Sequence, residues 1–284
     1  MLQRRRYDAA VGGDPRRRFP PSFFTRRHFY AHIRSGEGRP TAGESAMSED
    51  TSSFPMTDWS LIRRVAGDEE PAARRLDLNE LLKRYMPPMR RFIRQRFRLN
   101  DDEAEDWLQG FITSKLLQSA LLSRADQDHG KFRALLSRAL ADYGIDQFRR
   151  RRTRGPNGHG TDEQSPVEIA APATSDPAVL FERHWAEHAI AEALRLTKER
   201  LCATNRAAAW EVFSRRLLEQ GEAARSYQVL TNEFGFEKPS QAAIALNTAK
   251  RIFRRKLNDV LIEFGATHQD LGVALAELRN IFQN

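Results

Sequence analysis

Apolar side chains recur three and four positions apart through most of the chain from Thr57 onward, and this period constrains the fold more than any other feature. Such spacing gathers apolar side chains on one face of an α-helix, whereas a half-buried strand would need strict alternation. No alternation is sustained, and no internal repeat is visible. The expected helices cover residues 57–67, 78–97, 100–116, 130–152, 180–196, 205–219, 222–234, 240–264 and 268–282. The sequence therefore predicts an all-α protein, with a kink or a helix junction at Pro87-Pro88.

Two stretches lack this helical period. Residues 1–56 are rich in Arg, Gly, Pro and Ser, and we expect a disordered basic tail there. A mis-assigned start codon is the alternative for this tail, because Met47 and Met56 both precede the periodic sequence. Residues 155–178 are too long for a connection inside a compact domain. We therefore expect two small helical domains, residues 57–154 and 179–284, joined by a flexible linker.

Positive charge is concentrated in two parts of the chain. The formal net charge is +8, and residues 1–46 contribute +6 of it, from ten Arg and four acidic residues. Residues 131–154 hold eight Lys or Arg against Asp142 and Asp146, which again gives +6. Localised positive charge on helices indicates a polyanionic partner such as nucleic acid.

Several classes of protein are disfavoured by what the sequence lacks. The only cysteine, Cys202, excludes an internal disulfide and a cysteine-based metal cage. No apolar run is long enough to predict a membrane span. No nucleophile elbow, phosphate-binding glycine loop or dinucleotide fingerprint is present. We expect a cytoplasmic protein with no enzymatic activity and no cofactor.

The helix expected at residues 130–152 ends in an arginine-rich run. That run comprises Arg149, Arg150, Arg151, Arg152 and Arg154, and Lys131, Arg133 and Arg138 lie further up the same helix. The functional interpretation is contact with phosphates along a nucleic-acid groove. The alternative is a solvated helix end whose arginines interact with the helix dipole. Five arginines in six positions repel one another, which favours an anionic partner.

A second basic segment has the outline of a helix-turn-helix DNA reader. A short helix near residues 226–234 precedes a turn with Gly235 and Pro239, and then a longer helix that we expect Ser240 to cap. Gln241 and Asn247 can pair with adenine. The residues expected to reach phosphates are Lys250, Arg251 and Arg254. An ordinary helical hairpin is the alternative, but the absence of Asp and Glu from Pro239 to Lys256 favours DNA.

The segment His184-Trp-Ala-Glu187-His188 matches an inverted zinc-protease motif, with two His four positions apart and a Glu beside the second. Such a site needs a third ligand from another helix, and no candidate stands out. Trp185 also belongs to an apolar stripe, which favours an ordinary packed helix. A zinc hydrolase is therefore the least favoured hypothesis.

An ordered set of segments carries a family resemblance. The segments are Trp59-Ser-Leu-Ile62, Ala104-Glu-Asp-Trp-Leu-Gln-Gly-Phe111, Lys131-Phe-Arg-Ala-Leu-Leu136, the basic stretch after Asp146, and Leu180-Phe-Glu-Arg-His-Trp-Ala186. In this order they resemble the extracytoplasmic-function group of bacterial RNA polymerase sigma factors, in its planctomycete-type branch. The resemblance covers residues 57–284, with region two first and region four second.

The resemblance implies a protein that binds core RNA polymerase and reads two promoter elements. It implies that Asp106, Gln109 and Phe111 lie on the helix that docks on the polymerase. The residues implied to face the minus-ten element are Arg133, Arg138, Gln147, Arg149 and Arg150. Those implied to read the minus-thirty-five element are Gln241, Asn247, Lys250 and Arg251. Promoter DNA, core polymerase and an anti-sigma factor are the expected partners.

The chain departs from the family pattern at several positions. Trp107 and Leu108 replace a usual Leu-Thr pair, and Gly110 replaces a helix-favouring Glu at a cost of about 1 kcal/mol. The segment after the basic helix and the turn before Pro239 also differ. These departures bear on affinity and promoter preference more than on the general role. The alternative function is a stand-alone helix-turn-helix transcriptional regulator.

Overall fold

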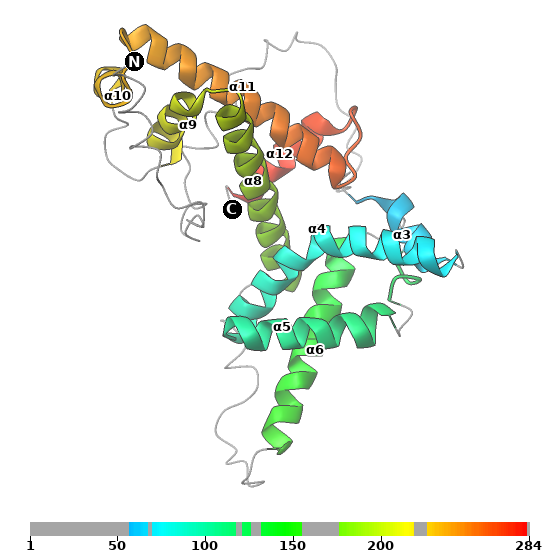
Figure 1. Cartoon of the computed structure of the whole chain (residues 1–284). Coiled ribbons are helices and arrows are strands. Elements are labelled where there is room, and N and C mark those ends of the chain that lie inside the picture. Colours follow the sequence, from blue (N-terminus) through cyan, green and yellow to red (C-terminus); the bar gives the residue numbers. More distant parts are fainter. Residues whose placement is uncertain are drawn as a thin grey trace, which may run out of the picture.

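The structure is a computed structural model that describes residues 57–67, 70–117, 121–125, 132–154, 176–218 and 226–282 (Figure 1). The expected tail, residues 1–56, and all but the end of the expected linker lie outside these ranges. The helices are α3 (Trp59–Ala66), α4 (Pro71–Phe97), α5 (Asp101–Phe111), α6 (Phe132–Arg154), α8 (Pro177–Ala203), α9 (Ala207–Phe213), α10 (Tyr227–Phe234), α11 (Pro239–Glu263) and α12 (Leu271–Ile281). Short π-helical turns, η2 (Ile112–Leu117) and η3 (Ser214–Leu218), continue α5 and α9. Throughout the described part of the chain the regular structure is helical, so the all-α prediction is confirmed.

Helices α3 to α6 form the N-terminal half, in which α4 is the central element. It is one helix that runs through Pro87 and Pro88 and bends along its course in Figure 1. Its buried side includes Met89, Phe92 and Phe97, which form a core with α5 and α6. The sequence predicts Asn100 as the cap of α5, and the structure confirms it: the Asn100 side chain accepts a hydrogen bond from the Glu103 backbone N–H as part of a capping box.

Gly110 has a structural reason to be glycine. It lies on α5 where the helix meets α6, and a Cβ atom built there would be 2.2 Å from the Tyr143 hydroxyl oxygen. The Tyr143 ring packs edge-on against Phe111, with the ring centroids 5.6 Å apart. Glycine lowers the helix propensity at this position, but it leaves the space that the Tyr143 hydroxyl needs between the two helices.

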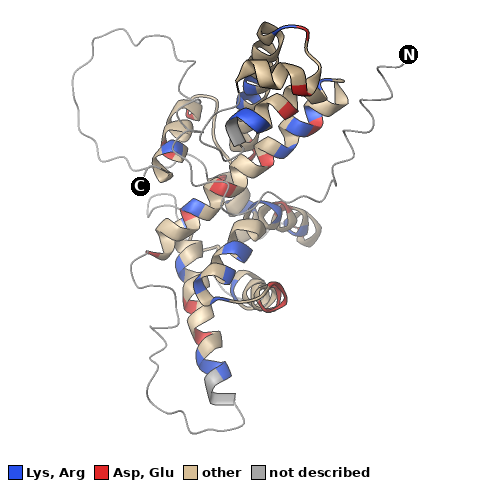
Figure 2. Cartoon of the chain, turned by 90° about the vertical axis from the view of Figure 1, so that its left-hand side faces the viewer, with Lys and Arg blue, Asp and Glu red and all other residues tan. Residues whose placement is uncertain are grey.

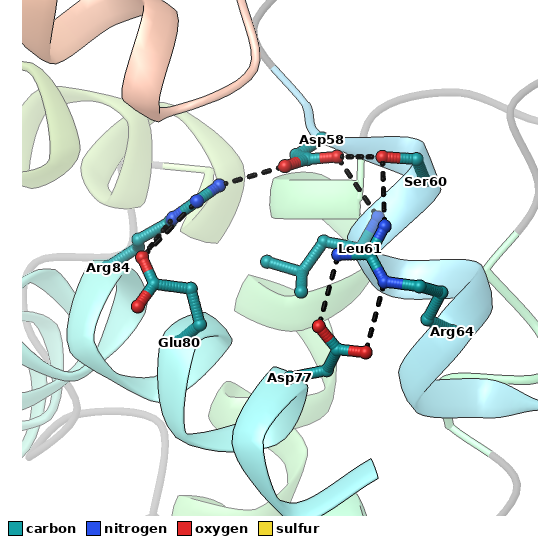
Figure 3. Close-up of polar contacts among 7 residues, drawn as sticks. All are labelled: Asp58, Ser60, Leu61, Arg64, Asp77, Glu80 and Arg84. Carbon is teal, nitrogen blue, oxygen red and sulfur yellow. Dashed lines mark hydrogen bonds and ion pairs between the residues drawn. The ribbon is translucent and has the colours of Figure 1, made fainter. Parts of the chain in front are cut away.

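A polar network fastens α3 to α4 (Figure 3). The Asp58 carboxylate caps α3 by accepting a hydrogen bond from the Leu61 N–H at 3.0 Å, and it pairs with Arg84 of α4 at 3.1 Å. Burial raises the pKa of Asp58, but the hydrogen bonds that its carboxylate accepts outweigh this, and the pKa lies below its ordinary value. A second link joins Arg64 to Asp77 through two hydrogen bonds. The sequence predicts Thr57 as the cap of α3, but the cap is Asp58, so that prediction is wrong.

Helices α9 to α12 form the C-terminal half with the greater part of α8. The side chain of Ser226 accepts a hydrogen bond from the Val229 N–H and caps α10, and Gly235 ends that helix with φ +72°. Helix α11 then begins at Pro239, so the expected cap at Ser240 is wrong: Ser240 already lies inside the helix. Proline suits this first position because its missing N–H would have had no partner within the helix.

Helix α8 packs against both halves. The Phe181 ring lies 5.8 Å from that of Phe92 on α4, and the Arg133 guanidinium of α6 lies 4.3 Å from the Trp185 ring centroid. On its other side, the Trp185 ring is 5.4 Å from that of Phe264, which follows α11. The buried apolar side chains of the two halves thus form one continuous core. The division into two independent domains on a flexible linker stays a prediction.

Candidate nucleic-acid interface

One surface of α11 gathers most of the residues expected to read DNA. Its buried side is lined by Ala242, Leu246, Ala249, Phe253, Leu257, Val260 and Leu261. The opposite side is exposed and carries Gln241, Ile244, Asn247, Arg251 and Arg254, which we call the α11 surface. These residues follow one another at three- and four-residue spacing, so they lie along one stripe of the helix. Short helix α10 precedes α11 and packs against it, which is the order of elements that the helix-turn-helix prediction requires.

Two residues of the predicted reader have contacts that change their expected roles. The Gln241 side-chain oxygen accepts a hydrogen bond from the Glu237 backbone N–H at 3.0 Å, so this side chain folds back on the turn. Lys250 is half-buried at the edge of the α11 surface. Burial lowers the pKa of Lys250, and the nearby positive charge of Arg216 lowers it further. Gln241 is thus exposed but held against the turn, and Lys250 is less exposed than Asn247 and Arg251.

Arg216 is a candidate that the sequence analysis missed. It belongs to η3, and its guanidinium lies 4.3 Å from the ring centroid of Tyr227 on α10. Its effect on the pKa of Lys250 places a further positive charge beside α11. The pair Arg215-Arg216 was visible in the sequence, but only the fold brings Arg216 near Lys250, which lies 34 residues further along the chain.

The end of α6 forms a second positive surface. Arg149 and Arg150 are both exposed there, and we call this pair the α6 end. Arg138 is also exposed, but the exposed acids Asp142 and Asp146 lie between it and the α6 end (Figure 2). The exposed positive charge of the described part of this helix is therefore concentrated near its end.

Other residues near the α6 end turn toward the protein. Gln147 is half-buried and hydrogen-bonds to the Tyr143 hydroxyl. Burial raises the pKa of Tyr143, against the opposing charge of Arg150 and the bond from Gln147. Arg151 pairs with Glu103 at 2.9 Å and lies 4.9 Å from the Trp107 ring centroid. Trp107, one of the departures from the family pattern, thus holds an arginine of the basic run against α5.

Two expected site residues are corrected by the structure. Arg133, expected to face DNA, is 0% exposed and pairs with Glu182 of α8 at 2.8 Å. Phe111, expected to contact the polymerase, is also 0% exposed and belongs to the core. Both lie on the inner faces of their helices, so neither side chain can reach a partner. Asp106 and Gln109, by contrast, are exposed on α5 and lie three residues apart on one face.

In the segment that matches a zinc-protease motif, the Glu187 carboxylate already pairs with basic side chains. Glu187 is buried, and its carboxylate oxygens lie 3.1 Å from a nitrogen of Arg91, 3.4 Å from one of Arg183 and 3.4 Å from one of His184. Burial raises the pKa of Glu187, but these neighbours lower it by more. Two arginines at one carboxylate make an unfavourable site for a cation. Within the described ranges, no three His, Cys, Asp or Glu side chains are placed to hold a metal ion.

Comparison with known proteins finds no match for this chain among family models, curated proteins or solved structures. None of the described helices is both long and apolar enough to cross a membrane. The likeness to sigma factors therefore stays a prediction that depends on the segments of its sequence.

Proposed function

We propose that this protein is an RNA polymerase sigma factor, which binds core polymerase and directs it to promoters. The observation that carries the proposal is that exposed arginines gather on two helix surfaces, at the end of α6 and on α11. Figure 1 shows that α11 and the end of α6 lie at opposite ends of the described part of the chain. These two surfaces are the α6 end and the α11 surface with its helix-turn-helix support. A single chain that contacts DNA at two separate points suits the recognition of two promoter elements.

The two contacts would act together. Each surface offers only a few phosphate contacts, so each alone would bind DNA weakly at physiological salt. When polymerase holds the protein on a promoter, binding at one element raises the effective concentration at the other. The protein is thus proposed to be a non-enzymatic cytoplasmic factor whose partners are core polymerase, promoter DNA and an anti-sigma factor.

The proposal is tested by transcription in vitro. Core RNA polymerase from the source organism is combined with this protein and a library of that organism's promoter fragments. Specific transcripts that require the protein would support the proposal, and their start sites would define the promoter sequence. Tight, sequence-specific binding to duplex DNA without polymerase, with no dependent transcripts, would favour a stand-alone regulator instead.

Replacing both arginines of the α6 end by alanine is expected to lower the yield of open promoter complexes. The change Arg149→Ala with Arg150→Ala should also make the dependence of promoter-DNA affinity on salt less steep. The slope of the logarithm of affinity against the logarithm of salt concentration should fall in magnitude by about 1.4, since each single-strand phosphate contact contributes about 0.7. Filter binding over a range of salt concentrations measures this slope. Lys198→Ala with Arg200→Ala removes two exposed charges from α8 and is the matched control. An unchanged slope in the first variant would remove the α6 end from the site.

Asp106→Ala is expected to weaken association with core polymerase by roughly tenfold, the value of one hydrogen bond to a charged group. The midpoint of thermal unfolding should stay close to that of the unmodified protein, because Asp106 is exposed and lies beyond the first turn of α5. Asp102→Ala, an exposed carboxylate in that first turn, is the control. Equal polymerase affinity in both variants would show that Asp106 is not an interface residue.

A further inference from the structure

Ile244 is a large apolar side chain on the α11 surface, between Gln241 and Asn247. It is 65% exposed, although it lies on a helix whose other side is fully buried. Arg251 lies two turns away on the same stripe, and Asn247 is the next exposed residue along it. An exposed isoleucine alone is ordinary, but this one lies in the first turns of the α11 surface, ahead of its arginines.

The neighbours of Ile244 leave it well placed to contact a ligand. Gln241, one turn earlier, is bound to the turn through the Glu237 backbone N–H. The first side chain of the stripe that projects without such a bond to the turn is therefore Ile244, followed by Asn247. In a helix-turn-helix protein, the first turns of the second helix are the part that meets the base edges in the major groove.

The charge around Ile244 identifies duplex DNA as the occupant of this surface. No Asp or Glu occurs between Glu237 and Asp259, while Arg251, Arg254 and Arg255 are exposed beyond Ile244 on the same helix. An exposed apolar side chain two to three turns from a cluster of arginines matches a duplex, in which phosphates border a groove that exposes one apolar group. That group is the C5-methyl of thymine.

We propose that Ile244 contacts the C5-methyl group of a thymine in the major groove and so makes α11 select an A·T base pair at one position of its site. Asn247, one turn further along, is placed to pair with an adenine beside it. The inference depends on the proposed function, because it names the base that the α11 surface reads.

The test compares Ile244→Ser with Val273→Ser, which removes an exposed valine from α12 as a matched control. Each full-length protein, with and without core polymerase, selects sequences from a duplex library with randomised positions. The unmodified protein and the control should enrich thymine at one position at which Ile244→Ser shows no preference. That thymine is then replaced by deoxyuridine, which lacks only the methyl group. The replacement should weaken binding of the unmodified protein about fourfold, the value of one buried methyl group, and leave binding of Ile244→Ser unchanged.

The outcomes separate this inference from the proposed function. If the unmodified protein selects a sequence and Ile244→Ser selects the same one, with thymine and deoxyuridine bound equally, the inference alone is overturned. Loss of polymerase association in Ile244→Ser, with an unchanged selected sequence, would also overturn it, since Ile244 would then serve a protein contact. Tight binding to the same selected thymine without polymerase, with no transcripts that depend on the protein, would support the inference and contradict the sigma-factor role. If no sequence is selected under either condition, both are overturned.

Discussion

Replacing Arg133 by alanine is expected to lower the free energy of unfolding by about 3–5 kcal/mol, the usual cost of removing one partner of a buried ion pair. The guanidinium is fully buried between α6 and α8, where it pairs with Glu182 and lies against the Trp185 ring. Alanine would leave the Glu182 carboxylate without this partner in a nearly buried site and would open a cavity beside the tryptophan. Urea denaturation followed by circular dichroism measures the change.

Two further variants define what the Arg133 result means. Arg138→Ala changes an exposed arginine on the same helix and should alter the free energy of unfolding by less than about 0.5 kcal/mol. The double variant Arg133→Met with Glu182→Gln removes both charges and keeps most of the volume, and it should recover much of the loss. A small loss in Arg133→Ala would mean that Glu182 finds another partner or that the site admits water.

Gly265→Ala is expected to destabilise the protein by about 2–4 kcal/mol, since strained backbone alone costs about 1–3 kcal/mol. Gly265 has φ +105°, a conformation that side chains with a Cβ atom rarely adopt. A Cβ atom there would also lie 2.4 Å from the backbone nitrogen of Asp58, and a backbone neighbour cannot rotate away. The change therefore strains the loop and separates it from the start of α3. Thermal and urea unfolding measure the effect.

Gly272→Ala is the matched control for this substitution. Gly272 lies at the start of α12 with no atom within 4 Å of an added Cβ, and its φ is not in the positive region. Alanine should therefore stabilise the protein slightly, by about 0.5–1 kcal/mol, through helix propensity. Equal effects at the two glycines would contradict the proposed close contact between Gly265 and the backbone of Asp58.

The local pattern of the sequence was enough to predict most of the fold. The three-and-four period identified the helices, and side-chain chemistry identified the Asn100 cap and the end of α10 at Gly235. These features depend on residues only a few positions apart. How the two halves pack against each other did not follow from the sequence. The period of α8 shows that its apolar residues share one face, but it does not show which helices cover that face.

The candidate site was predictable to a lesser degree, for the same reason. Residue type marked both Arg133 and Arg149 as contacts for phosphate, but only packing distinguishes them. Arg133 meets Glu182 and Trp185 on α8, whereas Arg149 lies at the exposed end of its helix. The sequence alone does not distinguish an arginine that packs against a distant aromatic residue and a distant carboxylate from an arginine that faces solvent.

Trp185 has neighbours in both halves, with Arg133 of α6 on one side and Phe264 beyond α11 on another. Because one side chain contacts both halves, substitutions in regions that are distant in the sequence depend on one another. A larger or smaller residue at Trp185 would have to be matched by changes near Arg133 and near Phe264 at once. Related chains should therefore vary at these three positions together, even where the surfaces around them diverge to suit different partners.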